Sequence, residues 1–305
     1  MRWLAGLLVA QVALMTVLVV LVATDNVPFV RNLRDGGGGD GDAAASVPKA
    51  TAGRFDGAAA YASVRRQVAL GPRPAGSPAS RRLAERLRRA LPAGRFQAVP
   101  GGLRNVVGVV PGRDRRRLVV VGAHYDTKDQ KGFVGAEDGA GGAAILTQLA
   151  RTVKPRTLRS TVVFIAFDGE EAPAGTADVD FERVALRGSK VAAHRYSRAR
   201  SMVLLDFVGQ KGLRIPREAS SNGPLWGRLR AASKRAGVAR VFPSGRTQGA
   251  IVDDHTPFQR AGVPAIDLID FDYACFHRSC DDLSQISQRS LDAVGETMLE
   301  LLPRL

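Results

Sequence analysis

Cysteine is scarce in this chain, with only Cys275 and Cys280 among 305 residues. A zinc site built from thiolates needs further cysteines, and no second pair is present to complete one. The close spacing of the two cysteines permits a disulfide in an oxidising compartment, but the sequence alone does not show that it forms. A cysteine-based metal site is therefore disfavoured, and the pairing stays open.

Aromatic residues are also few, at 6% of the chain, whereas Lys and Arg outnumber Asp and Glu by 44 to 29 and give a formal charge of +15. A charge of this sign raises nucleic acid or an anionic membrane as partners. The basic residues fall in short arginine runs such as residues 113–117, without interleaved aromatic residues and without a nucleic-acid-binding motif. We interpret them as a solvated surface and expect no nucleic-acid partner.

The chain begins with a long apolar run. Residues 3–23 contain no charged residue, and a helix of that length matches the hydrocarbon core of a bilayer, which is about 30 Å thick. The run exceeds the roughly 7–15 apolar residues of an ordinary signal peptide, and Leu21-Val22-Ala23 is a mediocre cleavage site. We therefore expect residues 1–24 to be a transmembrane anchor that binds the protein to a membrane, with a cleaved signal segment as the alternative.

Glycine, aspartate and alanine dominate the next stretch, residues 25–50, whose composition is typical of a flexible tether. A single folded domain is expected at residues 51–305. The arginines that flank the apolar run give no clear prediction of orientation. We expect the domain to lie outside the cytoplasm, the more usual outcome for an N-terminal segment followed by one long domain, or to be secreted if the segment is cleaved.

Apolar runs alternate with helical patterns through this domain. Strands are expected at residues 105–110, 117–123, 160–167, 200–207 and 263–269, and helices at about 56–70, 77–92, 140–153, 180–196, 224–236 and 287–302. Strands that are apolar throughout and separated by helices predict an α/β fold, a three-layer sandwich with a mixed, mostly parallel central sheet.

Acidic residues and histidines follow the ends of these strands. In open α/β sheets, ligands bind outside the carboxyl ends of the strands. The strand ends and the loops near them supply nine such residues: His124, Asp126, Asp138, Glu170, Glu171, Asp206, Asp253, His255 and His277. So many carboxylates at one edge would repel one another unless a cation lay among them.

Zinc fits this set of side chains best, because carboxylates and imidazoles are its usual ligands where no thiolate pattern exists. Alternation in an extended stretch sends adjacent Glu170 and Glu171 in opposite directions. One of them can therefore bind a metal ion while the other faces the substrate as a base.

Several of these residues also have plain structural interpretations. Asp138 precedes a helix and is a candidate N-cap, and Asp126 is a candidate turn residue. His124 is open to interpretation as a packed or exposed histidine. We interpret His255 as the cap of a turn. Asp206 is harder to dismiss, because an acid in an otherwise buried strand is costly without a partner.

Seven motifs resemble, in this order, glutaminyl cyclases and the zinc aminopeptidases that share their fold: GAHYDTK, VGAEDGAGGAAILTQLAR, VVFIAFDGEEA, LRGS, VLLDFVG, DDHTPFQRAGVPAIDLI and FHRSCDDLSQI. The earlier RQVALGPRPAGSPAS also resembles the cyclases. The resemblance extends from about residue 60 to the C-terminus. It implies that residues 51–305 are a catalytic domain with the fold of the zinc aminopeptidases.

The resemblance also implies a role for each site residue. Asp138, Glu171 and His277 would be zinc ligands, and Glu170 would be the general acid/base. In aminopeptidases, which use two zinc ions, Asp138 would bridge and the second zinc would be held by His124 and Asp206. In cyclases, which use one, Asp206 would instead join a hydrogen-bonded acidic network with Glu170 and Asp253.

Two enzymatic functions follow from the resemblance, both on peptide or protein N-termini. The first is a glutaminyl-peptide cyclotransferase, which forms pyroglutamate and releases ammonia; the alternative is a zinc aminopeptidase. A third hypothesis is a membrane-tethered binding domain without catalysis, and it is disfavoured because no implied ligand is missing. Phe276 stands where many cyclases carry a tryptophan, so the shape of the substrate pocket stays open.

Overall fold

The structure is a computed structural model that describes residues 46–305. The expected anchor at residues 1–24 and most of the expected tether lie outside this range. Val47 and Ala50, at the end of the expected tether, are buried in the core of the domain. Within the described range, no helix has both the length and the apolar character needed to cross a bilayer.

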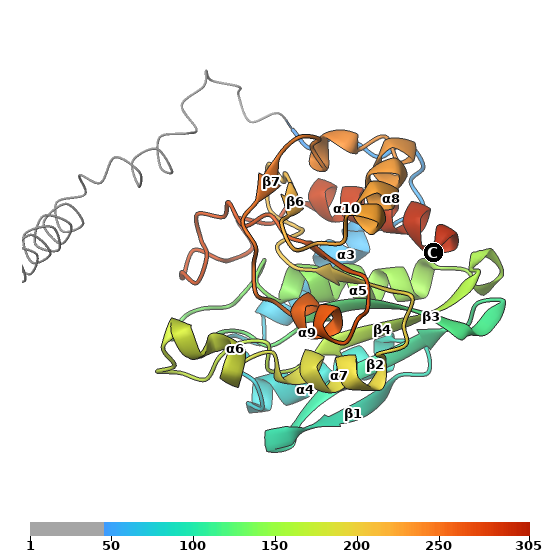
Figure 1. Ribbon diagram of the computed structural model, residues 1–305. Coiled ribbons are helices and arrows are strands. Elements are labelled where there is room, and N and C mark those ends of the chain that lie inside the picture. Colours follow the sequence, from blue (N-terminus) through green and yellow to red (C-terminus); the bar gives the residue numbers. More distant parts are fainter. Residues whose placement is uncertain (1–45) are drawn as a thin grey trace, which may run out of the picture. The chain divides into compact units, whose positions relative to one another are not determined.

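A six-stranded sheet forms the middle layer, with the strand order β1-β2-β4-β3-β5-β8 (Figure 1). The strands are β1 (Arg95–Val99), β2 (Leu103–Val110), β3 (Asp114–His124), β4 (Ser160–Phe167), β5 (Ser201–Leu205) and β8 (Ala265–Leu268). Strands β3, β4, β5 and β8 run parallel, whereas β1 and β2 form an antiparallel edge. The predicted mixed, mostly parallel sheet is confirmed. The short strands β6 (Arg217–Glu218) and β7 (Thr247–Gln248) pair separately.

Helices cover both faces of this sheet (Figure 1). One face packs against α3 (Gly57–Val68), α4 (Pro78–Ala90), α5 (Ala140–Thr152), α8 (Gly223–Arg235) and α10 (Gln288–Leu301), and the other against α7 (Arg187–Arg195) and α9 (His255–Arg260). Because side chains alternate along a strand, β3 sends Val119 and Val121 into the first core and Val120 into the second. The three-layer sandwich is therefore confirmed.

The remaining helical segments are short: α6 (Phe181–Val184) and the 3-10 turns η1 (Pro100–Gly102), η2 (Pro155–Thr157), η3 (Asp178–Asp180), η4 (Ala239–Val241) and η5 (Leu302–Arg304). Helix α4 shows why the longer helices begin where they do. The side chain of Ser77 accepts a hydrogen bond from the Ser80 backbone N–H at 3.1 Å, and Pro78 occupies the first turn, where its missing N–H costs nothing.

The helix expected at residues 180–196 is interrupted, and that expectation was wrong. Helix α6 ends before Leu186, which has the left-handed φ of +56°, and α7 begins after it. The backbone N–H of Leu186 donates to the Glu170 carbonyl at 3.0 Å, and that of Arg187 donates to the Gly169 carbonyl at 2.8 Å. These two bonds divert the chain from the helix, and they fix the loop that carries Glu170. Strand β1 and helix α9 were not predicted.

Candidate metal centre

The parallel strands deliver the predicted side chains to their common carboxyl edge. His124 is the last residue of β3, and it pairs with Phe167 at the end of β4. Glu170 and Glu171 follow β4 in the loop held by Leu186, and Asp206 follows β5 directly. All of these acids and His124 are buried.

One group consists of Asp138, Glu171 and His277. The Nε2 atom of His277 lies 3.5 Å from Asp138 Oδ2 and 3.5 Å from Glu171 Oε1. Asp138 Oδ2 and both carboxylate oxygens of Glu171 are buried and accept no hydrogen bond. Buried polar atoms normally have partners. Three such oxygens beside an imidazole are therefore what a divalent cation would need as ligands.

A second group shares Asp138. The Nε2 atom of His124 lies 3.3 Å from Asp138 Oδ1 and 3.4 Å from Asp206 Oδ1. The two oxygens of Asp138 thus face different groups, Oδ2 toward His277 and Oδ1 toward His124. Burial opposes a charge on His124, but hydrogen bonds to Asp138 and Asp206 raise its pKa well above the usual value. The side chains fit one cation in the first group and a second cation in the other.

Asp138 is not the cap of α5. The N-cap is Gly139, and no side chain caps this helix. The loop before it is held by Asp281, whose carboxylate accepts from the backbone N–H groups of Glu137 at 2.8 Å and Asp138 at 3.1 Å, and from the Tyr273 hydroxyl at 2.7 Å. Asp281 was not predicted as a site residue, because nothing local in the sequence shows that a distant loop will donate to it.

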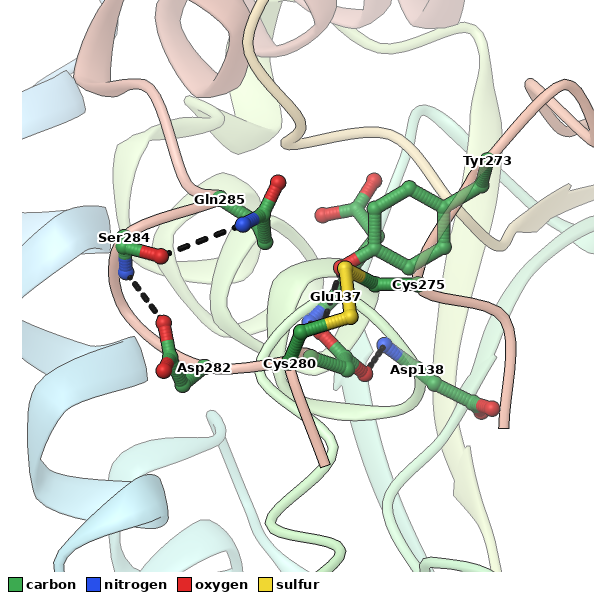
Figure 2. The surroundings of a disulfide bond; sticks show 9 residues. Glu137, Asp138, Tyr273, Cys275, Cys280, Asp282, Ser284 and Gln285 are labelled. Carbon is green, nitrogen blue, oxygen red and sulfur yellow. Dashed lines mark hydrogen bonds between the residues drawn. A yellow bond between two sulfur atoms is a disulfide. The ribbon is translucent and has the colours of Figure 1, made fainter. Parts of the chain in front are cut away.

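A disulfide lies beside this loop (Figure 2). Cys275 and Cys280 are bonded, with 5.4 Å between their Cα atoms, so the pairing that the sequence left open is formed. The ring that it closes contains His277, which has the left-handed φ of +51°. The imidazole of His277 stacks on Phe276 with 3.8 Å between ring centroids. The disulfide and the stacking partner together restrain a histidine whose backbone would not favour this conformation by itself.

Glu170, Asp206 and Asp253, which were predicted to form an acidic network, are buried close enough for their charges to act on one another. Burial raises the pKa of Glu170 well above its usual value, and the charges of Glu171 and Asp253 raise it further, while His124 opposes the shift. Burial and the neighbouring Asp253 raise the pKa of Asp206 to about 8. Glu170, Asp206 and Asp253 are 8%, 6% and 3% exposed. They therefore form one buried region in which protons compete with cations for the same carboxylates.

Asp126 has a structural role that the sequence did not reveal. It is fully buried, and its carboxylate accepts from the backbone N–H groups of Glu170 and Glu171, both at 3.3 Å. Its Oδ1 atom also lies 3.9 Å from Nδ1 of His124. Burial raises the pKa of Asp126 to about 7. Asp126 is therefore not a simple turn residue, because it orients the segment that carries both glutamates.

The interpretation of His255 as a turn cap was wrong. His255 is fully buried in the first turn of α9, and its Nε2 atom lies 3.0 Å from the Ser220 hydroxyl and 3.6 Å from Glu218. Its Nδ1 atom lies 3.7 Å from Asp267, a buried acid in β8. The pairing depends on segments far apart in the sequence. An acid in an apolar strand was a usable signal at Asp267, as it was at Asp206, and it was missed.

The fold and these buried carboxylate and imidazole groups are typical of an α/β metalloenzyme. The sequence model of peptidase family M28 matches residues 105–302, and this chain belongs to that family. The resemblance inferred from the motifs is thus confirmed.

Curated relatives and solved structures give the same result. The chain is 27% identical to a glutaminyl-peptide cyclotransferase of Boiga irregularis over 226 residues, and this alignment covers 60% of each sequence. A glutaminyl-peptide cyclotransferase-like protein of Bos taurus is 28% identical over 211 residues, which cover 58% of this chain and 54% of that protein. The chain therefore spans about 60% of the length of the curated relatives that it matches.

Among solved structures, a glutaminyl cyclase of Porphyromonas gingivalis superposes with a TM-score of 0.73 at 28% identity, covering 83% of this chain and 99% of that one. A Zn-dependent exopeptidase from Parabacteroides distasonis superposes with a TM-score of 0.72 at 25% identity, covering 85% and 100%. The fold is thus shared with a glutaminyl cyclase and with a Zn-dependent exopeptidase.

Proposed function

We propose that this protein is a zinc-dependent glutaminyl-peptide cyclotransferase, which converts the N-terminal glutamine of a peptide to pyroglutamate and releases ammonia. The observation that carries the proposal is the buried acidic region of Glu170, Asp206 and Asp253 beside a carboxylate and imidazole group that suits a metal ion. The cyclases among the curated relatives and the solved structures support this choice.

We assign one zinc ion to Asp138, Glu171 and His277, whose ligand atoms lie within 4.8 Å of one another. When bound, zinc supplies a Lewis acid that polarises the γ-carbonyl of the glutamine, an effect worth several kcal/mol. Asp281 and the disulfide ring hold Asp138 and His277 before the ion arrives, so little reorganisation is required.

Glu170 moves the proton in this proposal. The α-amine of the substrate attacks the carbonyl carbon of the glutamine side-chain amide, a C–N bond forms to close the ring, and Glu170 accepts the proton that the amine loses. Glu170 then gives this proton to the departing ammonia as the amide C–N bond breaks. Burial raises the pKa of Glu170, which makes its carboxylate a stronger base toward the proton of the amine.

The aminopeptidase remains a second candidate because of one specific observation. His124 and Asp206 form a complete second group on the other oxygen of Asp138. With two zinc ions bound, Glu170 would take a proton from water and deliver it to the departing amine. Asp206 would then be a ligand rather than a member of the acidic network.

Exposed aromatic side chains support a peptide substrate. Phe271 and Phe276 are 42% and 37% exposed, and their ring centroids lie 4.9 Å apart. Phe207 packs against both rings at 6.1 and 5.9 Å. Because Phe276 also stacks on His277, these rings offer an apolar surface to the part of a peptide that extends from the metal centre.

We place the catalytic domain outside the cytoplasm, bound to a membrane through residues 1–24 or secreted after their removal. The Cys275–Cys280 disulfide supports this location, because disulfides persist in oxidising compartments.

Ammonia release from a glutamine-initiated peptide by the full-length protein tests the function, with a leucine-initiated chromogenic amide and a zinc count on the same sample. Ammonia release with about one zinc per chain is expected for the cyclase. Cleavage of the leucine amide with about two zinc ions would establish the aminopeptidase instead. A zinc-loaded protein that processes neither substrate would contradict both proposals.

A further inference from the structure

The segment Gly71–Pro78, which resembles the cyclases in sequence, takes no part in the chemistry proposed above. Its Arg73 is 0% exposed and is the largest fully buried side chain in the described part of the chain. A buried guanidinium normally pairs with a carboxylate, because an isolated charge in the interior is strongly unfavourable. Within residues 46–305, however, no carboxylate oxygen lies within 4.0 Å of Arg73.

The guanidinium is held by backbone carbonyls instead. Nη1 donates to Val134 at 2.7 Å and to Gly71 at 3.1 Å, with a longer contact of 3.4 Å to Gln67, and Nη2 donates to Gly135 at 3.0 Å. The carbonyls of Gln67 and Gly71 belong to the segment that contains Arg73. Those of Val134 and Gly135 belong to the loop that leads to Asp138. Arg73 therefore joins two segments that are about 60 residues apart.

Asp281 holds the same loop through its other residues. Arg73 binds the carbonyls of Val134 and Gly135, and Asp281 accepts from the N–H groups of Glu137 and Asp138. The buried guanidinium of Arg73 thus donates to carbonyl groups of this loop, and the buried carboxylate of Asp281 accepts from its N–H groups. Asp138 lies at the end of this loop, and one of its carboxylate oxygens faces each candidate metal group.

Arg73 is also connected to the segment behind the two glutamates. Its backbone N–H donates to the hydroxyl of Thr127 at 2.8 Å, and its carbonyl accepts from the Thr127 N–H at 3.1 Å. Thr127 follows Asp126, which orients Glu170 and Glu171 through their N–H groups. One residue therefore links the loop that carries Asp138 to the strand end that positions Glu171.

The charge of Arg73 acts on the same acids. Burial lowers its pKa to about 10, while Asp281, Asp138 and Asp126 oppose that shift, so the guanidinium is charged at neutral pH. Arg73 thus provides a fixed positive charge behind the carboxylates before any metal ion is bound.

We propose that Arg73 is a positioning residue of the metal centre, which fixes the place of the loop that carries Asp138 and so determines zinc affinity. The inference rests on the proposed function in that it takes Asp138 as a zinc ligand. A residue that only stabilised the fold would affect unfolding and leave the affinity of the folded protein for zinc unchanged.

Zinc affinity of the full-length protein, measured by competition with a chromogenic chelator, separates these two roles. Arg73→Gln removes the charge and the forked donor, and it should weaken zinc binding by roughly 10–100-fold, the usual effect of losing a group that supports a metal ligand. Arg73→Lys keeps the charge but not the forked donor, and it should weaken zinc binding by a smaller factor than Arg73→Gln does.

Leu229→Ala is the matched control, because Leu229 is fully buried in α8 and its truncation destabilises the core. Urea unfolding of the metal-free proteins should show that Leu229→Ala and the Arg73 variants are destabilised to a similar degree. The zinc affinity of Leu229→Ala should nevertheless stay within about twofold of that of the unmodified protein. If Arg73→Gln does not fold, Arg73→Lys decides the question by the same measurement.

The inference is overturned if the folded Arg73 variants bind zinc within about twofold of the unmodified protein, or if Leu229→Ala weakens binding equally. An unmodified protein that binds no zinc would instead refute the metal centre of the proposed function. The two failures are therefore distinguishable.

Discussion

The two histidine-bearing groups that share Asp138 differ in how the fold presents them. His124 ends a central strand, and its side chain is 2% exposed, whereas His277 lies in a disulfide-closed loop with a side chain that is 25% exposed. The group of His124 is fixed by the sheet and is almost inaccessible to solvent, whereas the group of His277 is open to solvent on one side. A substrate can therefore approach the group of His277 directly, while the group of His124 is better suited to hold protons or an ion that is not exchanged.

Glu170 interacts electrostatically with a member of each group, His124 and Glu171, and its substitution should have the largest effect. Glu170→Gln should reduce turnover by about 10³-fold or more, because it removes the group that accepts and returns the proton. Zinc bound per chain, counted on the same sample, should not change. Loss of zinc together with activity would place Glu170 among the ligands and contradict its assignment.

Replacement of each histidine tests the comparison directly. His277→Ala should lose the zinc ion and lower activity by about 100-fold or more, since one of three protein ligands is removed. His124→Ala should keep about one zinc per chain if the enzyme is a cyclase, with a smaller loss of activity. Zinc counting and ammonia release are measured on both variants. Equal loss of zinc in the two variants would favour the two-metal aminopeptidase.

Opening of the disulfide should affect the His277 group and leave the His124 group intact. Closing a loop as short as that between Cys275 and Cys280 is worth about 2 kcal/mol of unfolding free energy in the chain-entropy model. The double variant Cys275→Ser/Cys280→Ser should lose about this much in urea unfolding and bind zinc about 10-fold more weakly. An unchanged zinc affinity would show that the stacking on Phe276 alone holds His277.

The pH dependence of the metal-free protein should give the smallest effect. Asp206 has a folded pKa of about 8, above its ordinary value, so the folded protein binds the proton more tightly than the unfolded chain does. Its stabilising contribution is complete below the unfolded pKa and is lost as the pH rises through about 8. The urea midpoint should fall on the order of 0.5 M between pH 5 and pH 8.5. A midpoint that rose over this interval would contradict the raised pKa.

The sequence predicted the sheet and the neighbourhood of the site because both depend on local patterns. Apolar strands place their carboxyl ends at one edge, so the proximity of His124, Glu171 and Asp206 followed from the strand assignments. The loop residues Asp138 and His277 were also singled out from the sequence, and the resemblance to a family implied their roles as zinc ligands. The structure brings all five side chains within reach of two ions.

Most of the missed features depend on contacts between segments that are far apart in the sequence. Leu186 leaves the helical path because its N–H group bonds to the loop of Glu170, and no helix propensity encodes that bond. Asp126 and Asp281 act through backbone N–H groups that belong to other segments. The burial of His255 required β8 and β6 to be placed beside α9. A sequence pattern identifies the side chains that do chemistry more readily than those that hold them.

The shared position of Asp138 has a thermodynamic consequence. Its single negative charge faces both groups, so an ion in one group withdraws charge from the other and alters the affinity there. Linkage requires this influence to be reciprocal and equal in free energy. Any two cations bound at this edge of the sheet are therefore coupled ligands, and their titration follows two unequal constants rather than one repeated constant.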